Sequence, residues 1–219
     1  MPLTYLLYRC PRCGNDPLEG SKDEANCPAC GLAFARGGEG GLIRILDPSG
    51  EAWEVPGHRL ASEVQGWTEK RLAEDRPGDA IIHSAVVRVR QSGPESPVHW
   101  GGGLLGFAEA MGEAVGGMLL LSREALTFDS GKKAGPHPGN PSGPGPTGRK
   151  TWPLLDIRAV QTSSSTLQFS PADGGLVEFK FPEDSPFRWE TLLRGTLKRV
   201  YRAEGLGEIV EFQPRIVTE

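Results

Sequence analysis

Alternating apolar and polar residues dominate the C-terminal half of the chain. The stretches Trp152–Val160, Thr166–Ser170 and Leu176–Phe181 alternate with a period of two, which predicts half-buried β-strands. Residues 171–175, Pro-Ala-Asp-Gly-Gly, are typical of a tight turn and join the last two strands into a hairpin. The pattern predicts an antiparallel platform, and nothing in it indicates catalysis.

An amphipathic helix is predicted directly after these strands. Ser185 and Pro186 suit the N-cap and the first turn, and the helix runs to about Ala203, before Gly205. Its apolar face is formed by Trp189, Leu192, Leu193, Thr196, Leu197 and Val200. Its basic residues lie on the other side: Arg188, Arg194, Lys198, Arg199 and Arg202. We expect Arg194, Lys198, Arg199 and Arg202 to be solvated, or to contact a partner or an anionic lipid surface at about 1 kcal/mol per charge.

Four further elements are predicted upstream. They are strands at 42–46, 52–55 and 80–90 and a helix at about 58–74. The first two strands form a hairpin that either extends the N-terminal module or lies on its neighbour. The helix is interpreted as a packing element between two modules, with partner binding as the alternative.

The segment 91–117 is interpreted as an insertion that contains a helix. Leu104, Phe107, Met111 and Val115 share one face of a helical wheel, and small residues flank that face. With Trp100, these residues are the candidate contacts to a partner helix or a membrane surface, because the segment is too short and too charged to span a bilayer. The alternative is a helix packed under the sheet.

Two other segments are irregular in sequence. The insertion 130–150 is rich in Pro and Gly, and such a loop is ordinarily disordered. The tail 206–219 contains an apolar alternation that predicts a strand, added to the chain's own sheet or to the edge of a partner's sheet.

The cysteines indicate a metal site. All of them lie in two CxxC pairs, Cys10/Cys13 and Cys27/Cys30, each followed by glycine. Since no export signal or transmembrane run is evident, we expect a cytoplasmic protein and one structural Zn²⁺ held by four thiolates. The motifs resemble the zinc-ribbon (rubredoxin-knuckle) family over residues 8 to about 36. The metal would stabilise a module too small to fold alone.

The strands and helix from about residue 79 to residue 202 look like the PH/GRAM superfamily in its bacterial PH-like form. The resemblance implies two packed, strongly bent antiparallel sheets capped by the C-terminal helix. Between Arg90 and Arg123 there is no Lys or Arg, which departs from the phosphoinositide-binding members and makes protein binding the better fit. The expected fold is thus mainly β with some α: a zinc ribbon at 1–40, a hairpin and connector helix at 41–79, a PH-like domain at 80–205 with its two insertions, and the tail.

Composition and charge reduce the number of plausible classes of function. The net charge of −4 and the acidic residues near the cysteines disfavour nucleic-acid binding. We expect a non-enzymatic scaffold or accessory subunit that binds protein subunits of a larger, membrane-bound complex at its cytoplasmic face. A nucleic-acid-associated zinc ribbon is the alternative and requires a basic patch that joins Arg9, Arg12 and Arg36. No organised set of catalytic residues supports an enzyme.

Overall fold

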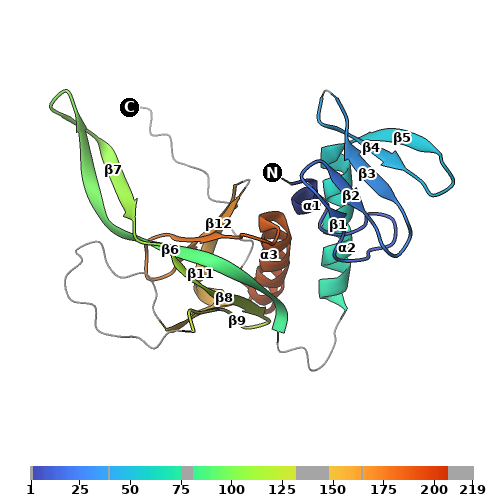
Figure 1. The fold of residues 1–219 in the computed structure, drawn as a ribbon. Helices are drawn as coiled ribbons and strands as arrows, with labels where there is room; N and C mark the ends of the chain where they lie inside the picture. Colours follow the sequence, from blue (N-terminus) through green and yellow to red (C-terminus); the bar gives the residue numbers. More distant parts are fainter. Residues whose placement is uncertain (1, 39, 75–80, 132–147, 164, 207–219) are drawn as a thin grey trace. The chain divides into compact units, whose positions relative to one another are not determined.

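A computed structural model describes residues 2–38, 40–74, 81–131, 148–163 and 165–206 (Figure 1). At residues 94–96, 98, 100 and 105–110 it describes the backbone alone. The chain divides into two compact units, 1–76 with 184–195 and 77–183 with 196–219. The division falls within the C-terminal helix.

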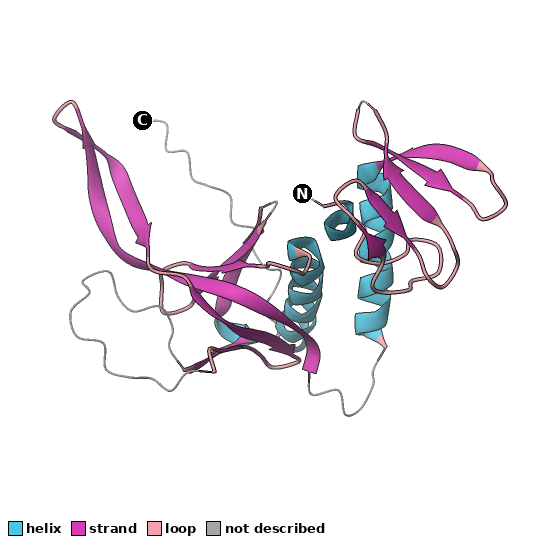
Figure 2. Cartoon of the chain, in the orientation of Figure 1, coloured by secondary structure: helices cyan, strands magenta, loops and turns pink. Residues whose placement is uncertain are grey.

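The first unit contains an antiparallel sheet of short strands and three helical segments (Figure 2). Its elements are α1 (Leu3–Leu6), β1 (Glu19–Gly20), β2 (Glu24–Asn26), β3 (Ala33–Arg36), β4 (Leu42–Leu46), β5 (Ala52–Pro56), α2 (Gly57–Ala73) and the first part of α3 (Pro186–Ala203). The strands follow the order β1-β2-β3-β4-β5. The β4–β5 hairpin therefore extends the cysteine-bearing sheet, which is one of the two positions that the sequence left open.

The core of this unit combines residues from its N-terminus, its sheet and α2. Leu3 and Leu7 at the N-terminus, Phe34 on β3, and Leu60 and Val64 on α2 are buried together. The spacing of the last two residues places them on one face of α2, as the helical periodicity predicts. Two of the cysteines belong to the same cluster, so the metal centre and the apolar core form one body.

The second unit is built on one large antiparallel sheet. Its strands are β6 (Ile81–Trp100), β7 (Gly103–Met111), β8 (Val115–Ser122), β9 (Ala125–Asp129), β10 (Arg149–Pro153), β11 (Ile157–Thr162), β12 (Thr166–Pro171) and β13 (Val177–Lys180), with a 3-10 turn η1 (Leu154–Asp156). The order is β10-β9-β8-β6-β13-β12-β11, and β7 pairs with β6. Together with the cysteine-bearing sheet of the first unit, this sheet makes the described part of the chain mainly β with few helices.

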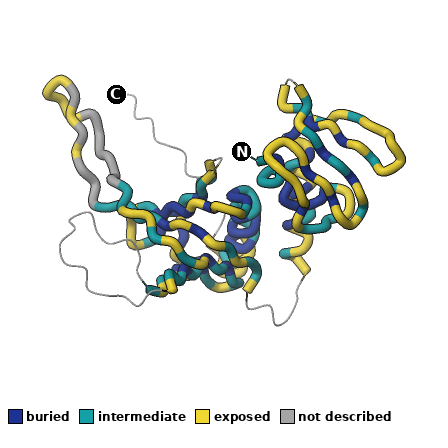
Figure 3. Tube along the Cα trace, viewed as in Figure 1, coloured by how far each residue is buried: buried dark blue, intermediate teal, exposed yellow. Residues whose placement is uncertain are grey.

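Aromatic side chains show that this sheet is strongly curved. The ring of Trp152 on β10 lies 5.2 Å from Phe169 on β12 and 6.0 Å from Phe179 on β13, edge-on in both cases. Because β10 and β12 are far apart in the strand order, their side chains can meet only if the sheet bends around its core. All three residues are buried. Figure 3 shows buried segments along this sheet and along α3.

The helix α3 has the predicted cap and the predicted apolar face. The backbone N–H of Arg188 donates to Ser185 Oγ at 3.1 Å, which is the expected N-cap bond. Trp189, Leu193 and Leu197 are fully buried. Near its end the hydroxyl of Tyr201 donates to the carbonyl oxygen of Ile157 at 2.6 Å, which fixes the last turns against β11.

Two predicted elements are wrong in detail. The stretch Trp152–Val160 is two strands, β10 and β11, because the turn η1 after Pro153 interrupts it. The predicted helix at Leu104–Val115 is instead strand β7 and the start of β8. Glycine costs a helix interior about 1 kcal/mol per residue, and this segment contains glycine at 106 and 112. Gly101 and Gly102 adopt positive φ (58° and 84°) in the turn of a two-residue hairpin, which favours pairing with β6.

Two predictions fall outside the described residues. Most of the Pro/Gly insertion (132–147) and of the tail (207–219) lies there. Strand β10, which follows the insertion, pairs with β9 over all five of its residues, from Arg149 opposite Asp129 to Pro153 opposite Ala125.

Candidate metal centre

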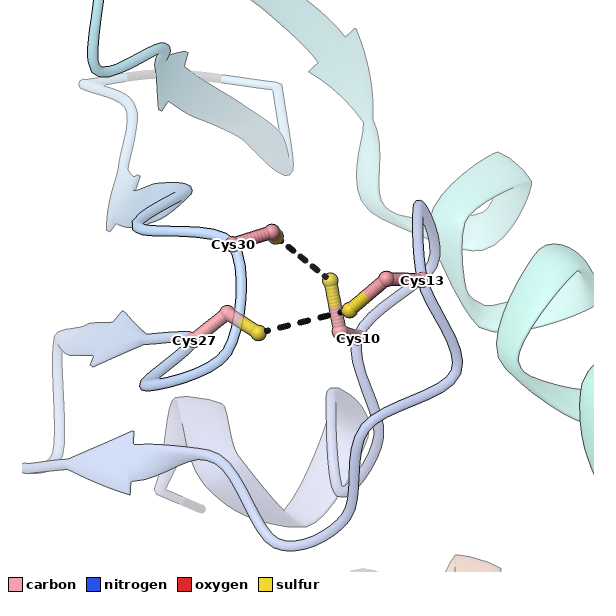
Figure 4. Close-up of side chains that lie close together, drawn as sticks. All are labelled: Cys10, Cys13, Cys27 and Cys30. Carbon is pink, nitrogen blue, oxygen red and sulfur yellow. Dashed lines mark hydrogen bonds between the residues drawn. The ribbon is translucent and has the colours of Figure 1, made fainter.

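The four cysteines converge from two loops (Figure 4). Their sulfur atoms all lie within 4.8 Å of one another. Cys10 Sγ lies 3.7 Å from Cys30 Sγ, and Cys13 Sγ lies 3.6 Å from Cys27 Sγ. A tetrahedral ion with metal–sulfur bonds near 2.3 Å requires sulfur separations of about 3.8 Å. The geometry therefore fits one metal ion held by four sulfur ligands.

Both loops have the same backbone hydrogen bonds. The N–H of Gly14 donates to the carbonyl oxygen of Cys10 and that of Gly31 to the carbonyl oxygen of Cys27, each at 2.9 Å. Both glycines adopt positive φ, 73° and 71°, a conformation that side chains disfavour. The glycine after each CxxC is therefore what allows the chain to fold back around the site.

Backbone amides point at the first cysteine of each pair. The backbone amides of Cys30 and Ala29 donate hydrogen bonds to Cys27. Burial alone would raise the pKa of Cys27, but hydrogen bonding lowers it to about 7. In the other loop burial dominates and raises the pKa of Cys10, although two amides oppose it. Such N–H donors stabilise a thiolate, the form that binds a metal.

Side chains outside the CxxC pairs support both loops. A Cβ at Gly14 would meet the ring of Trp67 on α2 at 3.0 Å, and one at Gly31 would meet Pro48 of the β4–β5 turn at 2.9 Å. The indole N–H of Trp67 also donates to the carbonyl oxygen of Pro11 at 2.8 Å. The helix and the hairpin therefore position the metal site. Trp67 lies in the helix predicted at about 58–74, but its approach to Gly14 joins residues too distant in sequence for any local pattern to reveal.

Partly buried ion pairs connect α3 to the cysteine-bearing sheet. Arg188 donates to Asp16 at 2.6 Å and to the carbonyl oxygen of Tyr8 at 3.1 Å, and Arg9 donates to the other oxygen of Asp16 at 2.8 Å. The guanidinium of Arg188 lies 5.2 Å from the centre of the Tyr8 ring. Arg188 is therefore not part of an exposed basic strip, which corrects the sequence-based assignment.

The arginines near the cysteines are all paired. Arg9 is buried and bonded to Asp16, while Arg12 lies 2.6 Å from Asp47 and Arg36 lies 3.1 Å from Asp23. A phosphate-binding surface needs cations that are available to the ligand. The basic patch that the nucleic-acid alternative requires is thus neutralised by neighbouring carboxylates.

The other basic residues of α3 remain at the surface. Lys198, Arg199 and Arg202 are exposed, and Arg194 is partly exposed with an ion pair to Glu190 at 3.0 Å. Arg158 on β11 is also exposed and acts electrostatically on Tyr201. The C-terminal half of α3 and the start of β11 thus present cations at one end of the second unit.

The candidate contact residues of the 91–117 insertion lie on strands. Trp100 is the register partner of Gly103 at the hairpin turn, and Phe107 is that of Pro97. Leu104 is 57% exposed near the turn, Met111 ends β7, and Val115 begins β8 opposite Val89. The hairpin therefore separates Leu104 near its turn from Met111 and Val115 at its base.

A scan against models of known protein families finds no match to this chain, and a search of curated proteins finds no relative. Within the described residues, none of the helices is long and apolar enough to cross a membrane.

Proposed function

We propose that this chain is a non-enzymatic scaffold or accessory subunit that binds other proteins at the cytoplasmic face of a membrane-associated assembly. In this proposal the cysteine-bearing sheet is a zinc ribbon, and the curved sheet with α3 is a PH/GRAM-like platform. The ion would be Zn²⁺, because a site of four thiolates with tetrahedral spacing suits zinc or an iron–sulfur centre, and a single closed site suits structural zinc. Four protein ligands leave no open position for a substrate.

The observation that carries the proposal is the set of exposed basic and apolar residues at one end of the second unit. Lys198, Arg199 and Arg202 are exposed on α3, and Leu206 and Leu155 are also exposed, at 57% and 44%. The N–H of Leu206 donates to the carbonyl oxygen of Tyr201, whose hydroxyl is bonded to β11 directly after Leu155 and η1. Apolar side chains among cations suit the boundary of an anionic membrane.

Protein binding is assigned to the β6–β7 hairpin beyond Gln91, called the ribbon below. It projects from the curved sheet (Figure 1), and its tip is apolar and uncharged. Leu104 near the turn is 57% exposed, and an exposed apolar residue of this kind is typical of protein contacts. Lys and Arg are missing from the sequence between Arg90 and Arg123, so the ribbon has nothing with which to hold anionic headgroups. The two surfaces thus have different roles: α3 faces lipid and the ribbon faces protein.

The first experiment is fractionation of native cells. Membranes are washed in high salt, and the proteins that co-purify with this chain are identified. Retention with a defined set of integral membrane proteins supports the proposal and names the partners. Recovery in the soluble fraction with nucleic acid overturns it.

A charge-reversal variant sharpens the same test. Replacing Lys198, Arg199 and Arg202 with Glu should release the chain from membranes, because each lost cation removes about 1 kcal/mol of attraction. The matched control replaces three exposed basic residues of the first unit, Lys22, Arg44 and Arg59, with Glu. Equal release by both variants would mean that net charge, and not the end of α3, holds the chain at the membrane.

A further inference from the structure

The outer face of the curved sheet carries two cations side by side. Arg88 on β6 and Lys180 on β13 are register partners, so their side chains leave the sheet on the same face, and both are exposed. The residues that alternate with them, Val87, Val89 and Phe179, are buried on the inner face. Like charges at directly opposite positions destabilise a sheet. Folding alone therefore gives no reason for this pair.

The described part of the chain does not neutralise these cations. Within it, neither Arg88 nor Lys180 has a hydrogen bond or an ion pair. Two residues further along β6, Arg90 is bonded to its register partner Glu178, which also accepts a hydrogen bond from Gln168 at 2.7 Å. The outer face thus supplies a carboxylate to one cation and none to the neighbouring pair, which leaves that pair available to a ligand.

Hydroxyl groups continue the same row of register partners across the sheet. Thr166 on β12 is the register partner of Lys180, and its hydroxyl lies 2.7 Å from that of Ser163 at the β11–β12 turn. On the other side of Arg88 the register partner is Gly116, and nothing lies within 4 Å of the position that a Cβ would take there. Since neighbouring strands are about 4.8 Å apart, cations and hydroxyls line roughly 15 Å of the outer face.

An exposed apolar residue lies next to the cations. Val86 is 54% exposed and precedes Arg88 by two residues on the same face of β6, a separation of about 6.6 Å. Side chains on one face of an extended peptide repeat at the same distance. A peptide with an apolar and an acidic side chain two residues apart therefore matches Val86 and Arg88 together.

Position in the sheet favours a protein over a membrane as the occupant. The residues assigned above to lipid lie near the start of β11, where the hydroxyl of Tyr201 is bonded to Ile157. Ser163 directly follows the other end of β11, six residues from Ile157 and so roughly 20 Å along the strand. This separation places the row outside the surface assigned to lipid, and it leaves a partner protein as the source of negative charge.

We propose that this row, called the basic row and formed by Arg88, Lys180, Thr166 and Ser163, binds an acidic segment of a partner protein. Acidic side chains of the segment neutralise the two cations. The hydroxyls of Thr166 and Ser163 share one hydrogen bond, so one O–H remains to donate to the ligand. An apolar side chain of the segment covers Val86. The proposal adds a second protein contact to the proposed function and does not depend on the roles of the ribbon or of the end of α3.

The test is a titration of the full-length, metal-loaded chain with the end-blocked peptide Leu-Ser-Glu-Ser-Glu, followed through the amide NMR signals. We expect the signals of Val86, Arg88, Thr166 and Lys180 to shift, with a dissociation constant that rises as salt is added. The control peptide has Gln in place of Glu and should shift none of them. Absence of these shifts with the acidic peptide overturns the proposal. So does a response of the same signals to phosphatidylglycerol vesicles and not to the peptide, which would assign the row to lipid.

The variant Arg88→Glu separates binding from folding. It places opposite charges at register partners with Lys180, so it should raise the urea midpoint of the second unit. The same change should raise the dissociation constant of the acidic peptide by roughly tenfold or more. Undiminished binding by this variant overturns the proposal.

The matched control is Lys198→Glu, which removes an exposed cation from the surface assigned to lipid. It should leave the dissociation constant of the peptide within about twofold, because Lys198 lies outside the basic row. An equal loss of binding by both variants would overturn the proposal, since net charge alone would then hold the peptide. Failure of the peptide titration leaves membrane retention of the chain unaffected, so the proposed function and the basic row are tested separately.

Discussion

The two units differ in what holds them together. In the first, strands β1, β2 and β3 have only two, three and four residues, and the buried cluster includes Cys10 and Cys27. The second has longer strands around an aromatic cluster, in which Phe169 and Phe179 stack at 5.7 Å. A small module cannot bury enough surface to fold alone, whereas a large curved sheet can. The comparison predicts that a metal ion at the four cysteines has the structural role in one unit that the aromatic core has in the other.

Removing the metal should produce the largest effect and should be confined to the first unit. Metal binding to four thiolates contributes on the order of 10 kcal/mol to folding. A strong chelator should therefore collapse the amide NMR signals of Phe34, Leu60 and the rest of residues 1–76, while those of the curved sheet persist. The bound metal, measured by mass spectrometry, should be about one zinc ion per chain. A metal-free chain with unchanged signals in the first unit would contradict the four-sulfur site.

The converse change is Phe179→Ala in the aromatic cluster. It should lower the free energy of unfolding of the second unit by about 3–5 kcal/mol, because a buried ring leaves a cavity. Urea unfolding gives this value, and the metal content should not change. Phe34→Ala, the matched change in the first unit, should weaken metal retention instead. If both variants lost metal equally, the two units would not be independent.

A smaller effect is expected from the partly buried ion pairs of the first unit. Arg188→Ala removes the arginine bonded to Asp184 and one of the two arginines bonded to Asp16, and it should cost about 2–3 kcal/mol. The control is Arg59→Ala, which removes an exposed pair with Glu63 at 3.7 Å and should cost less than about 0.5 kcal/mol. Thermal unfolding followed by circular dichroism measures both. Equal costs would show that the Arg188 contacts are no stronger than surface pairs.

The smallest effect separates two adjacent glycines of β8. A Cβ at Gly117 would meet the carbonyl oxygen of Asp129 at 2.4 Å and the Phe128 ring at 2.5 Å, whereas one at Gly116 would meet nothing within 4 Å. Gly117→Ala should therefore destabilise the second unit by about 1–3 kcal/mol, and Gly116→Ala should be close to neutral. Chemical unfolding of both variants checks the difference. A neutral Gly117→Ala would mean that β8 and β9 are packed less closely than the structure shows.

Local patterns predicted much of the fold. The alternation of apolar residues predicted β12 and β13 and, as one uninterrupted strand, β10 and β11, and the cap at Ser185 predicted the start of α3. Prediction failed where a local preference competes with a distant partner. The Gly-rich segment around Phe107 has helical spacing, but β6 supplies hydrogen bonds that a helical wheel cannot anticipate. Likewise Arg188 looks solvent-facing on the wheel, and its partner Asp16 lies 172 residues away.

The sequence by itself determined the candidate metal ligands, because two CxxC pairs each followed by glycine specify both the donor atoms and the backbone turn around them. It also determined the apolar face of α3, since helical period and side-chain type suffice for that. Only the tertiary structure decided that Trp67 and Pro48 support the cysteine loops and that the ribbon is a hairpin. The physical reason is range: periodicity and turn chemistry act over a few residues, whereas register, burial and ion pairing depend on which distant segments the folded chain brings together.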